Sequence, residues 1–433
     1  MSRDLTPGGS DPFHAAPTVW AVLLVFVGTY VLIAARRLSA LPIGRPAGAL
    51  LGASAMVALS VVDPANGLSP HEAFAAVEPN TIALLLGMML LAAALGEAGF
   101  FDIAADWLGR RGLSAARLLH VVVIGSGLLS ALLVNDSVCL LLAPVVDGAA
   151  KRAGRSRVPY LLGLAMGANA GSAMTLAGNP QNMLVAHLSG ISYREYLVKG
   201  GIPGAAALVT TSFVLRWCLR ADLAKSEPQV AASLPERRGV NRYRLRVAAG
   251  CTLLASALFF AGANLAWSAI GAATLMMLLR GREPDDLFDK VAWTVLLFFG
   301  ALFIVVGGLQ KTGLLARALA DVTPYFPTSR AGSLVGLASA LVVGCQIVSN
   351  VPFILLAEPW LRVLPDPHLA WTGTALFSTL AGNLTLLGSV ANIIVVETTN
   401  AEDEIGFVRY AKVGIPVTIA SSVVAGAVLL FTS

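Results

Sequence analysis

The residues of this chain best suited to bind a ligand lie in four short polar segments, each inside a long apolar stretch. They are 135–137 (Asn-Asp-Ser), 178–182 (Gly-Asn-Pro-Gln-Asn), 349–352 (Ser-Asn-Val-Pro) and 388–392 (Gly-Ser-Val-Ala-Asn). Their side chains supply amides, hydroxyls and one carboxylate, with no lysine or arginine. Such groups can bind a small polar solute, a proton or a sodium ion, but they offer no cation to pair with a bound anion.

Asp136 is the only acidic residue in these four segments. A carboxylate at the centre of a bilayer costs about 2.5–3.5 kcal/mol, so such residues usually serve a function. We therefore predict that Asp136 binds the coupling ion. The alternative is a structural role, in which a hydrogen-bonded or protonated Asp136 holds the chain at this point.

The elements that position these segments must cross a membrane. The chain has 433 residues, of which 56% are hydrophobic and 13% charged, whereas soluble domains are about 25% charged. This composition excludes a soluble enzyme and a disordered chain, and the long apolar runs disfavour a porin-type barrel. Because basic residues of membrane proteins collect in cytoplasmic loops, the net charge of +5 does not indicate nucleic-acid binding.

Eight continuous spans are predicted, at 18–35, 46–62, 81–97, 202–219, 245–261, 265–279, 293–309 and 414–430. Segments 161–187 and 372–398 are predicted to be broken helices, and 118–146 and 334–361 to be re-entrant hairpins. This arrangement crosses the bilayer ten times, or twelve times if each hairpin arm spans it. With the N-terminus outside, 23 of the 30 lysines and arginines lie on the cytoplasmic side, which favours this orientation.

The two halves of the chain resemble each other. Thr175, Gly178 and Asn182 recur as Thr385, Gly388 and Asn392 at an offset of 210 residues, and the segment from Val134 matches the segment from Val348 at 214. We predict a first repeat over 1–220, a cytoplasmic linker over 221–244 and a second repeat over 245–433. Five spans in each repeat make the second inverted relative to the first, as is typical of secondary transporters.

Repeat symmetry predicts that the four polar segments meet near the middle of the membrane. There, the free N–H groups of half-helices attract electron-rich oxygens. Asn169, Ser172 and Asn383 either line this site or join helices by hydrogen bonds. The predicted solute and coupling-ion residues are Asn135, Asp136, Ser137, Thr175, Gly178, Asn179, Asn182, Ser349, Asn350, Thr385, Gly388, Ser389 and Asn392.

No enzyme chemistry is expected. No nucleophile and base form a recognisable pair, so no catalytic residue is assigned. The four cysteines have no metal-ligand spacing, and no phosphate-binding loop is present. The sequence therefore predicts neither a metal site nor a cofactor, and it predicts transport driven by an ion gradient.

At the polar segments the chain resembles the ion transporter superfamily, whose members share a citrate-transporter-like fold. The resemblance rests on 133–144, 178–182, 349–352 and 387–392 and covers nearly the whole chain. The Asn-Asp pair at 135–136 looks most like arsenite permeases of the ArsB type. NhaD-type sodium/proton antiporters and divalent-anion/sodium symporters belong to the same superfamily, but the Ser-Asn-Thr tips of the dicarboxylate symporters are missing here.

The resemblance implies a multi-pass protein of the cell inner membrane that moves a small inorganic solute. The first hypothesis is efflux of arsenite or antimonite coupled to proton entry by alternating access. The alternatives are sodium/proton antiport and symport of an inorganic or dicarboxylate anion. A homodimer and a cytoplasmic ATPase subunit docked on the linker stay open as partners.

Overall fold

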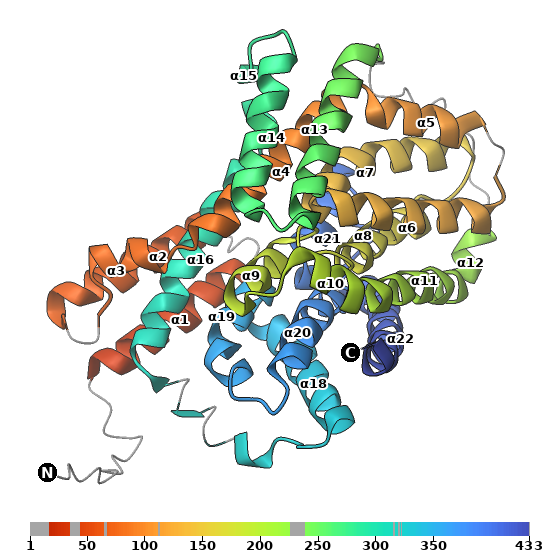
Figure 1. Ribbon diagram of the computed structural model, residues 1–433. Helices are drawn as coiled ribbons and strands as arrows, with labels where there is room; N and C mark the ends of the chain where they lie inside the picture. The colour runs from red at the N-terminus through yellow and green to blue at the C-terminus, as the bar shows by residue number, and fades with distance from the viewer. Residues whose placement is uncertain are drawn as a thin grey trace, which may run out of the picture. The chain divides into compact units, whose positions relative to one another are not determined.

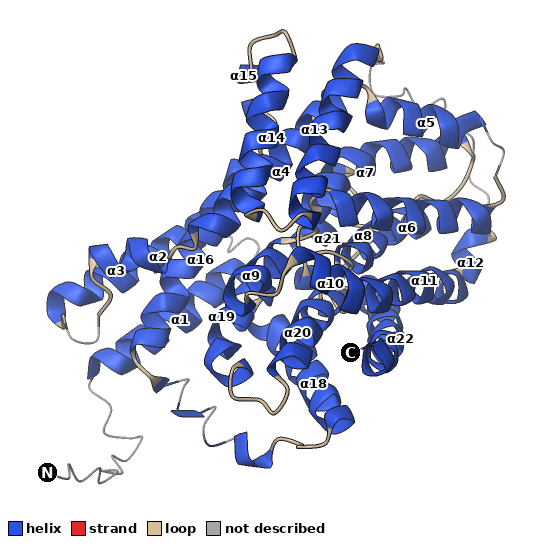
Figure 2. Ribbon diagram, in the orientation of Figure 1, coloured by secondary structure: helices blue, strands red, loops and turns tan. Residues whose placement is uncertain are grey.

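We describe a computed structural model of the chain, covering residues 17–34, 44–64, 67–110, 113–225, 239–314, 317–318, 321 and 323–432. Every regular element in these ranges is a helix, and no strand occurs among them (Figure 2). The predicted all-α fold is therefore confirmed. The chain forms two compact units, one of residues 1–78 with 294–322 and the other of 79–293 with 323–433.

The first unit contains α1 (Pro17–Ala34), α2 (Arg45–Val62), α3 (Pro70–Ala76) and nearly all of α16 (Trp293–Lys311). The short helix α3 begins with a capping box in which Ser69 and Glu72 exchange hydrogen bonds. Lys311 Nζ donates to Glu72 Oε2 at 2.8 Å and to the Gly67 carbonyl at 2.7 Å. Hydrogen bonds from Lys311 and Ser69 lower the pKa of Glu72 to about 2, so the end of α16 is held by an ionised partner.

The second unit contains all four polar segments. Its helices are α4 (Pro79–Glu97), α5 (Phe100–Arg110), α6 (Ala115–Leu132), α7 (Asn135–Arg152), α8 (Val158–Ser172), α9 (Pro180–Ser189), α10 (Tyr193–Lys199), α11 (Gly201–Cys218), α12 (Arg220–Leu223), α13 (Arg242–Phe260), α14 (Leu265–Leu279), α15 (Asp285–Phe288), α18 (Arg330–Val348), α19 (Asn350–Leu361), α20 (Pro367–Ala381), α21 (Val390–Thr398) and α22 (Phe407–Thr432). Two short 3-10 turns, η2 (Thr323–Tyr325) and η3 (Leu386–Gly388), complete it (Figure 1).

Each of the eight predicted continuous spans is a helix. Within the described residues, seven helices are long and apolar enough to cross a membrane, and the pair α10–α11, bent by 49°, makes an eighth. Two of the seven, α6 and α18, are first arms of the predicted hairpins, whereas the predicted spans at 18–35 and 265–279 form the shorter apolar helices α1 and α14. The last span is longer than predicted, because α22 already begins at Phe407. Residues 226–238, the middle of the predicted linker, lie outside the described residues.

Both predicted hairpins consist of two helices joined by a short break. Leu133 and Val134 separate α6 from α7, which lie side by side in Figure 1, and Ser349 alone separates α18 from α19. The polar residues therefore form first helical turns, whereas the sequence placed them at irregular tips. Asn135 shows why a helix can begin here. Its backbone N–H, which has no partner within the helix, donates to the Gly178 carbonyl at 2.9 Å.

Both predicted broken helices are interrupted, but earlier than the sequence indicated. Residues 173–179 separate α8 from α9, and residues 382–389, which include η3, separate α20 from α21. Pro180 and Val390 are the first helical residues after these breaks, because the preceding Asn179 and Ser389 adopt extended backbone. Thr175 and Thr385 consequently lie inside the breaks.

Helices α6 and α8 approach closely through glycines. A Cβ on Gly171 would lie 2.1 Å from the Gly127 carbonyl oxygen, and one on Gly167 would lie 2.6 Å from the Val123 carbonyl oxygen. Small residues that let backbones touch are a common device in membrane helix packing. The contact fixes α8, which carries Asn169 and Ser172, against the first hairpin.

Gly171→Ala is expected to destabilise the protein by about 1–3 kcal/mol, because the new methyl group must displace backbone. The matched control is Gly125→Ala in α6, where a Cβ would meet nothing within 4 Å. This control should be neutral or stabilising by about 0.5–1 kcal/mol, since alanine favours a helix over glycine. Thermal unfolding in detergent measures both, and equal melting temperatures would contradict the packing argument.

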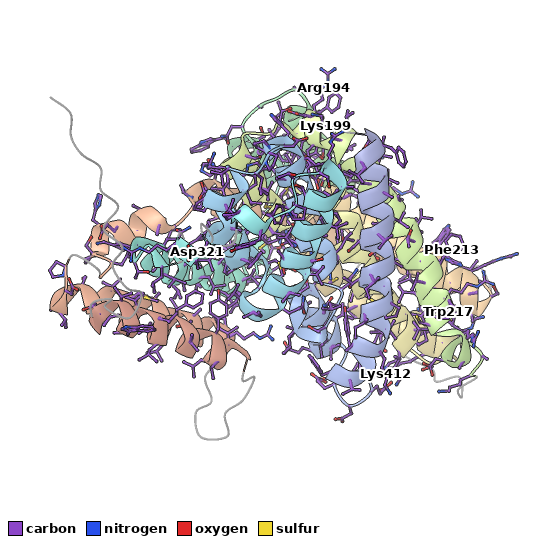
Figure 3. The ribbon with its side chains drawn as sticks, turned by 90° about the horizontal axis from the view of Figure 1, so that it is seen from below. Arg194, Lys199, Phe213, Trp217, Asp321 and Lys412 are labelled. Carbon is purple, nitrogen blue, oxygen red and sulfur yellow. The ribbon has the colours of Figure 1, made fainter. Side chains whose placement is uncertain are left out.

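Basic residues mark the two ends of the second unit. Figure 3 shows Arg194 and Lys199 at one end and Lys412 at the opposite end. The predicted topology places the first two outside and the third in the cytoplasm. The picture is consistent with that assignment, while the orientation itself stays a prediction.

Candidate functional site

Each helix break is closed by an asparagine in the first turn of the following half-helix. Asn182 Nδ2 donates to the carbonyls of Ser172 at 3.4 Å and Thr175 at 2.9 Å. At the 210-residue offset, Asn392 Nδ2 donates to the carbonyls of Gly382 at 2.8 Å and Thr385 at 3.1 Å. The same two bonds thus satisfy backbone carbonyls in both irregular segments, which explains why Asn recurs at this position.

Asn169, near the end of α8, binds both the first hairpin and the second break. It is 1% exposed. Its Nδ2 donates to Asn383 Oδ1 at 3.0 Å and Asn392 Oδ1 at 2.9 Å. Its Oδ1 accepts from Asn135 Nδ2 at 3.0 Å and Ser389 Oγ at 3.1 Å. One buried amide therefore links the first hairpin to the second break.

Thr379 of α20 contacts the first break as Asn169 contacts the second. Its Oγ1 accepts from Asn179 Nδ2 at 3.2 Å, and its single O–H faces two acceptors, the Ala375 carbonyl at 2.8 Å and Asn182 Oδ1 at 3.1 Å. Thr379, Asn182 and Asn179 lie 210 residues from Asn169, Asn392 and Ser389. A two-fold relation between repeats requires such exchanged pairs, in which each half contacts the other through the same positions.

The hydrogen bonds determine which way each amide faces. Asn392 gives its NH₂ group to backbone carbonyls, so its Oδ1 must accept from Asn169. Asn169 Oδ1 then accepts from the NH₂ group of Asn135. This sequence of donors leaves Asn135 Oδ1 buried and without a hydrogen-bond partner in the described structure.

Asp136 follows Asn135 in the first turn of α7. It is 4% exposed, and within the described residues its carboxyl group has neither a hydrogen bond nor an ion pair. Ser130, whose backbone lies beside Gly178, also has a buried hydroxyl without a partner. The first hairpin thus presents a carboxylate, an amide oxygen and a hydroxyl that the surrounding described chain leaves unsatisfied.

The second hairpin has its own unsatisfied group and a strained residue. Asn350 Oδ1 at the start of α19 is buried without a partner in the described chain. Ser349 has φ 68° and ψ 161°, a region used almost only by glycine. One turn earlier, Gln346 Nε2 donates to the Ala381 carbonyl at 2.9 Å and its Oε1 accepts from Thr385 Oγ1 at 2.8 Å. Gln346 therefore ties this hairpin to the second break.

The structure brings most of the predicted site residues into one connected region. Members of that region are Asn135, Thr175, Gly178, Asn179, Asn182, Ser389 and Asn392, joined through Asn169, Ser172 and Asn383. Ser137 is half-buried with no hydrogen bond in the described chain, and Ser349 and Asn350 are not bonded to this region. Thr385 also belongs to the connected region, because its carbonyl accepts from Asn392 Nδ2. It lies with Gly388 in the second break, beside Gln346.

Sequence reasoning missed Thr379 and Gln346. The signal for Thr379 was present, since applying the 210-residue offset to Asn169 leads directly to it. Gln346 had no such signal, because Leu132 occupies the corresponding position of the first hairpin at an offset of 214. Its role depends on the distance between α18 and the second break.

Paired helix breaks, packed against two hairpins and holding a buried acid, define a membrane secondary transporter. No lysine or arginine donates to this region in the described chain, so its binding groups are neutral apart from Asp136. The sequence profile of the citrate transporter family, CitMHS, matches residues 30–372. The chain belongs to this family, within the ion transporter superfamily, and the predicted resemblance is confirmed.

Named relatives match the chain over nearly its full length. An uncharacterized transporter of Mycobacterium tuberculosis is 31% identical over 427 residues, covering 94% of this chain and 97% of the relative. The silicon efflux transporter LSI3 of rice is 28% identical, covering 88% and 91%. The putative transporter arsB of Dictyostelium discoideum is 24% identical, covering 93% and 89%.

A solved structure supports the fold. The YdaH transporter of Alcanivorax borkumensis, described as having an unusual topology, superimposes with a TM-score of 0.55. The match covers 95% of this chain and 96% of that one at 15% sequence identity. It confirms a transporter fold and carries no information on the solute.

Proposed function

We propose that this protein exports a small, uncharged, hydroxylated inorganic solute, with arsenite or antimonite first, in exchange for entering protons. The observation that carries the proposal is the buried region around Asn169, which offers amides and hydroxyls, one acid and no cationic side chain. Alternating access at this region provides transport, and Asp136 couples it to the proton gradient.

The solute class follows from hydrogen-bonding chemistry. Arsenite at neutral pH is an uncharged trihydroxide, so it presents O–H donors and oxygen acceptors but no charge. Asn135 Oδ1 and the Asp136 carboxylate are unsatisfied acceptors that such hydroxyls can reach. The names of the rice and Dictyostelium relatives point the same way, because dissolved silicon is also an uncharged hydroxide.

Asp136 is suited to couple transport to an ion because it can exist in two states. A buried carboxylate without a partner is costly, so it gains a proton, a cation or a hydroxyl donor when one is offered. Exchange of a proton for a solute hydroxyl at this carboxylate links the two movements. Its position in the first turn of α7 stabilises the ionised form, which lets the proton leave.

Alternating access in this proposal relies on two repeats of opposite orientation. The exchanged pairs Asn169–Asn392 and Thr379–Asn182 are what a two-fold axis between the repeats produces. We place the repeats at 1–220 and 245–433 with the N-terminus outside a cell inner membrane. A rocking movement then exposes one site to either side.

Sodium/proton antiport is the second candidate, and Asn135 Oδ1 is the observation that favours it. Hard cations such as sodium prefer oxygen ligands, and this amide oxygen is buried without a hydrogen-bond partner in the described chain. In this reading Asp136 binds sodium and protons in turn and no other solute is carried. Anion symport, whether of inorganic anions or dicarboxylates, relies instead on the positive ends of α9 and α21.

Uptake into everted membrane vesicles with an imposed pH gradient distinguishes arsenite export, sodium/proton antiport and anion symport. We expect accumulation of arsenite, measured by elemental analysis, that disappears when a protonophore dissipates the gradient. Vesicles without the protein provide the background. Sodium-dependent proton movement without arsenite uptake would overturn the proposal in favour of antiport, and gradient-driven uptake of citrate or phosphate alone would favour symport.

A further inference from the structure

Arg157, in the turn between α7 and α8, binds the far end of a half-helix from the second repeat. Its Nη1 donates to the Thr399 carbonyl at 2.8 Å and its Nη2 to the Asn400 carbonyl at 3.1 Å, just beyond α21. Nε and Nη2 also donate to Glu404 Oε1 at 2.9 and 2.5 Å, and Nη1 donates to Asp147 Oδ1 at 3.3 Å. All five N–H donors of the guanidinium are therefore used.

This contact completes an antiparallel pair of helices. Arg157 directly precedes α8, whose other end carries Asn169, and α21 begins near Asn392 and ends at Thr398. The two helices are thus joined by Asn169–Asn392 at the site and by Arg157 at the membrane face. Glu404 raises the pKa of the Arg157 guanidinium, so its charge persists at any physiological pH.

Arg362 makes the corresponding contact in the other pair. It lies between α19 and α20, and its Nη2 donates to the Leu188 carbonyl in the last turn of α9 at 2.8 Å. Like Arg157, it also pairs with an acid on the second hairpin arm, here Glu358 at 2.9 Å. At the site end, α20 and α9 are joined by Thr379 and Asn182.

We propose that Arg157 and Arg362 are positioning residues. Arg157 holds α21 in register against α8, and Arg362 holds α9 in register against α20, so that each contact joins one repeat to the other. An arginine at the outer end and an amide or hydroxyl at the site end prevent α21 and α9 from sliding. The contacts of Arg157 and Arg362 then set the positions of Asn392 and Asn182. Through Asn169, they also set the position of Asn135. The inference rests on the proposed function only in treating the region around Asn169 as the transport site.

The two arginines should differ in strength. The Arg157 side chain is 14% exposed, whereas the Arg362 side chain is 52% exposed and makes fewer hydrogen bonds. Exposed ion pairs contribute little, because water screens them. Lysine cannot replace either residue, since it lacks the planar fork with which Arg157 reaches two carbonyls and carboxylates together, and Arg362 one carbonyl and one carboxylate.

Hydrogen exchange of the purified protein in lipid nanodiscs, without solute, tests the proposal. Arg157→Lys is expected to accelerate exchange about tenfold in peptides covering 390–401, because charge-assisted hydrogen bonds are lost. The first turn of α7 should also exchange faster, since Asn135 depends on Asn169. Arg362→Lys should instead accelerate 180–189, by about threefold, because its contacts are exposed.

Two further variants keep the result interpretable. Glu404→Gln preserves shape and should give a smaller acceleration in 390–401. Arg409→Lys is the matched control, because Arg409 binds the Glu404 carbonyl and Asp222 and donates to neither Thr399 nor Asn400. Acceleration confined to 399–405, or equal acceleration in α13, would overturn the proposal. Because no solute is present, the outcome is independent of the vesicle assay.

Discussion

An Asp136→Asn protein is expected to lose proton-driven accumulation of arsenite in everted vesicles, by at least about a hundredfold, while staying folded. Asparagine keeps the shape of the side chain but cannot gain or release a proton. Solute exchange without a gradient should persist, because the amides around Asn169 are unchanged. The melting temperature should be equal or higher, since a neutral group removes the cost of burying a carboxylate.

Asp403→Asn is the matched control, because the same chemical change occurs at an exposed loop residue. Its transport rate should equal that of the wild type. If Asp136→Asn protein still pumps against a gradient at the wild-type rate, Asp136 is structural. The coupling group would then have to be sought elsewhere in the chain.

Asn169→Ala should be among the most destabilising single substitutions in the second unit, by about 3 kcal/mol or more. The change removes four hydrogen bonds and leaves Asn135, Asn383, Asn392 and Ser389 without their partner. Each buried polar group left unsatisfied costs about 1–3 kcal/mol. Thermal unfolding in detergent should show this as a large fall in melting temperature.

Asn241→Ala provides the control for this substitution. Asn241 is exposed and caps α13 with a single hydrogen bond from the Arg244 backbone at 3.0 Å. Its loss should cost about 1 kcal/mol. Equal melting temperatures for the two variants would show that the amides around Asn169 are already satisfied by other groups, and the assigned amide orientations would then be wrong.

The two halves of the site are related in position but differ in chemistry. At the 214-residue offset, Ser349 occupies the position of Asn135 and Asn350 occupies the position of Asp136. A symmetric framework therefore carries one titratable group rather than two. The acidic residue is thus a feature of the first hairpin alone, and the second hairpin has a neutral amide at that position.

The sequence alone determined the membrane character, the helical class and the location of the breaks. Apolar runs long enough to span a bilayer leave few alternatives, because every backbone polar group there must be satisfied within a helix. Gly, Asn, Ser and Pro inside such runs mark the interruptions. The offset of 210 residues correctly paired Asn182 with Asn392, since both close a break in the same way.

The residues at which the half-helices begin could be located only from the tertiary structure. Asn135 looked like an irregular tip residue, but its N–H finds the carbonyl of Gly178, more than 40 residues further along the chain. Gln346 and Arg157 were invisible as site or positioning residues for the same reason, whereas Thr379 could have been found from the repeat offset. Each acts on a partner distant in sequence, and a pattern of residue types cannot say which distant groups meet.

The orientation of the amides was likewise decided only by the folded chain. Asparagine can present either its oxygen or its NH₂ group, and the sequence does not distinguish them. In the structure, backbone carbonyls take the NH₂ group of Asn392, and this choice passes through Asn169 to Asn135. The sequence thus determined which polar residues interrupt the apolar runs, and tertiary packing decided that the side-chain oxygen of Asn135 is left without a hydrogen-bond partner in the described chain.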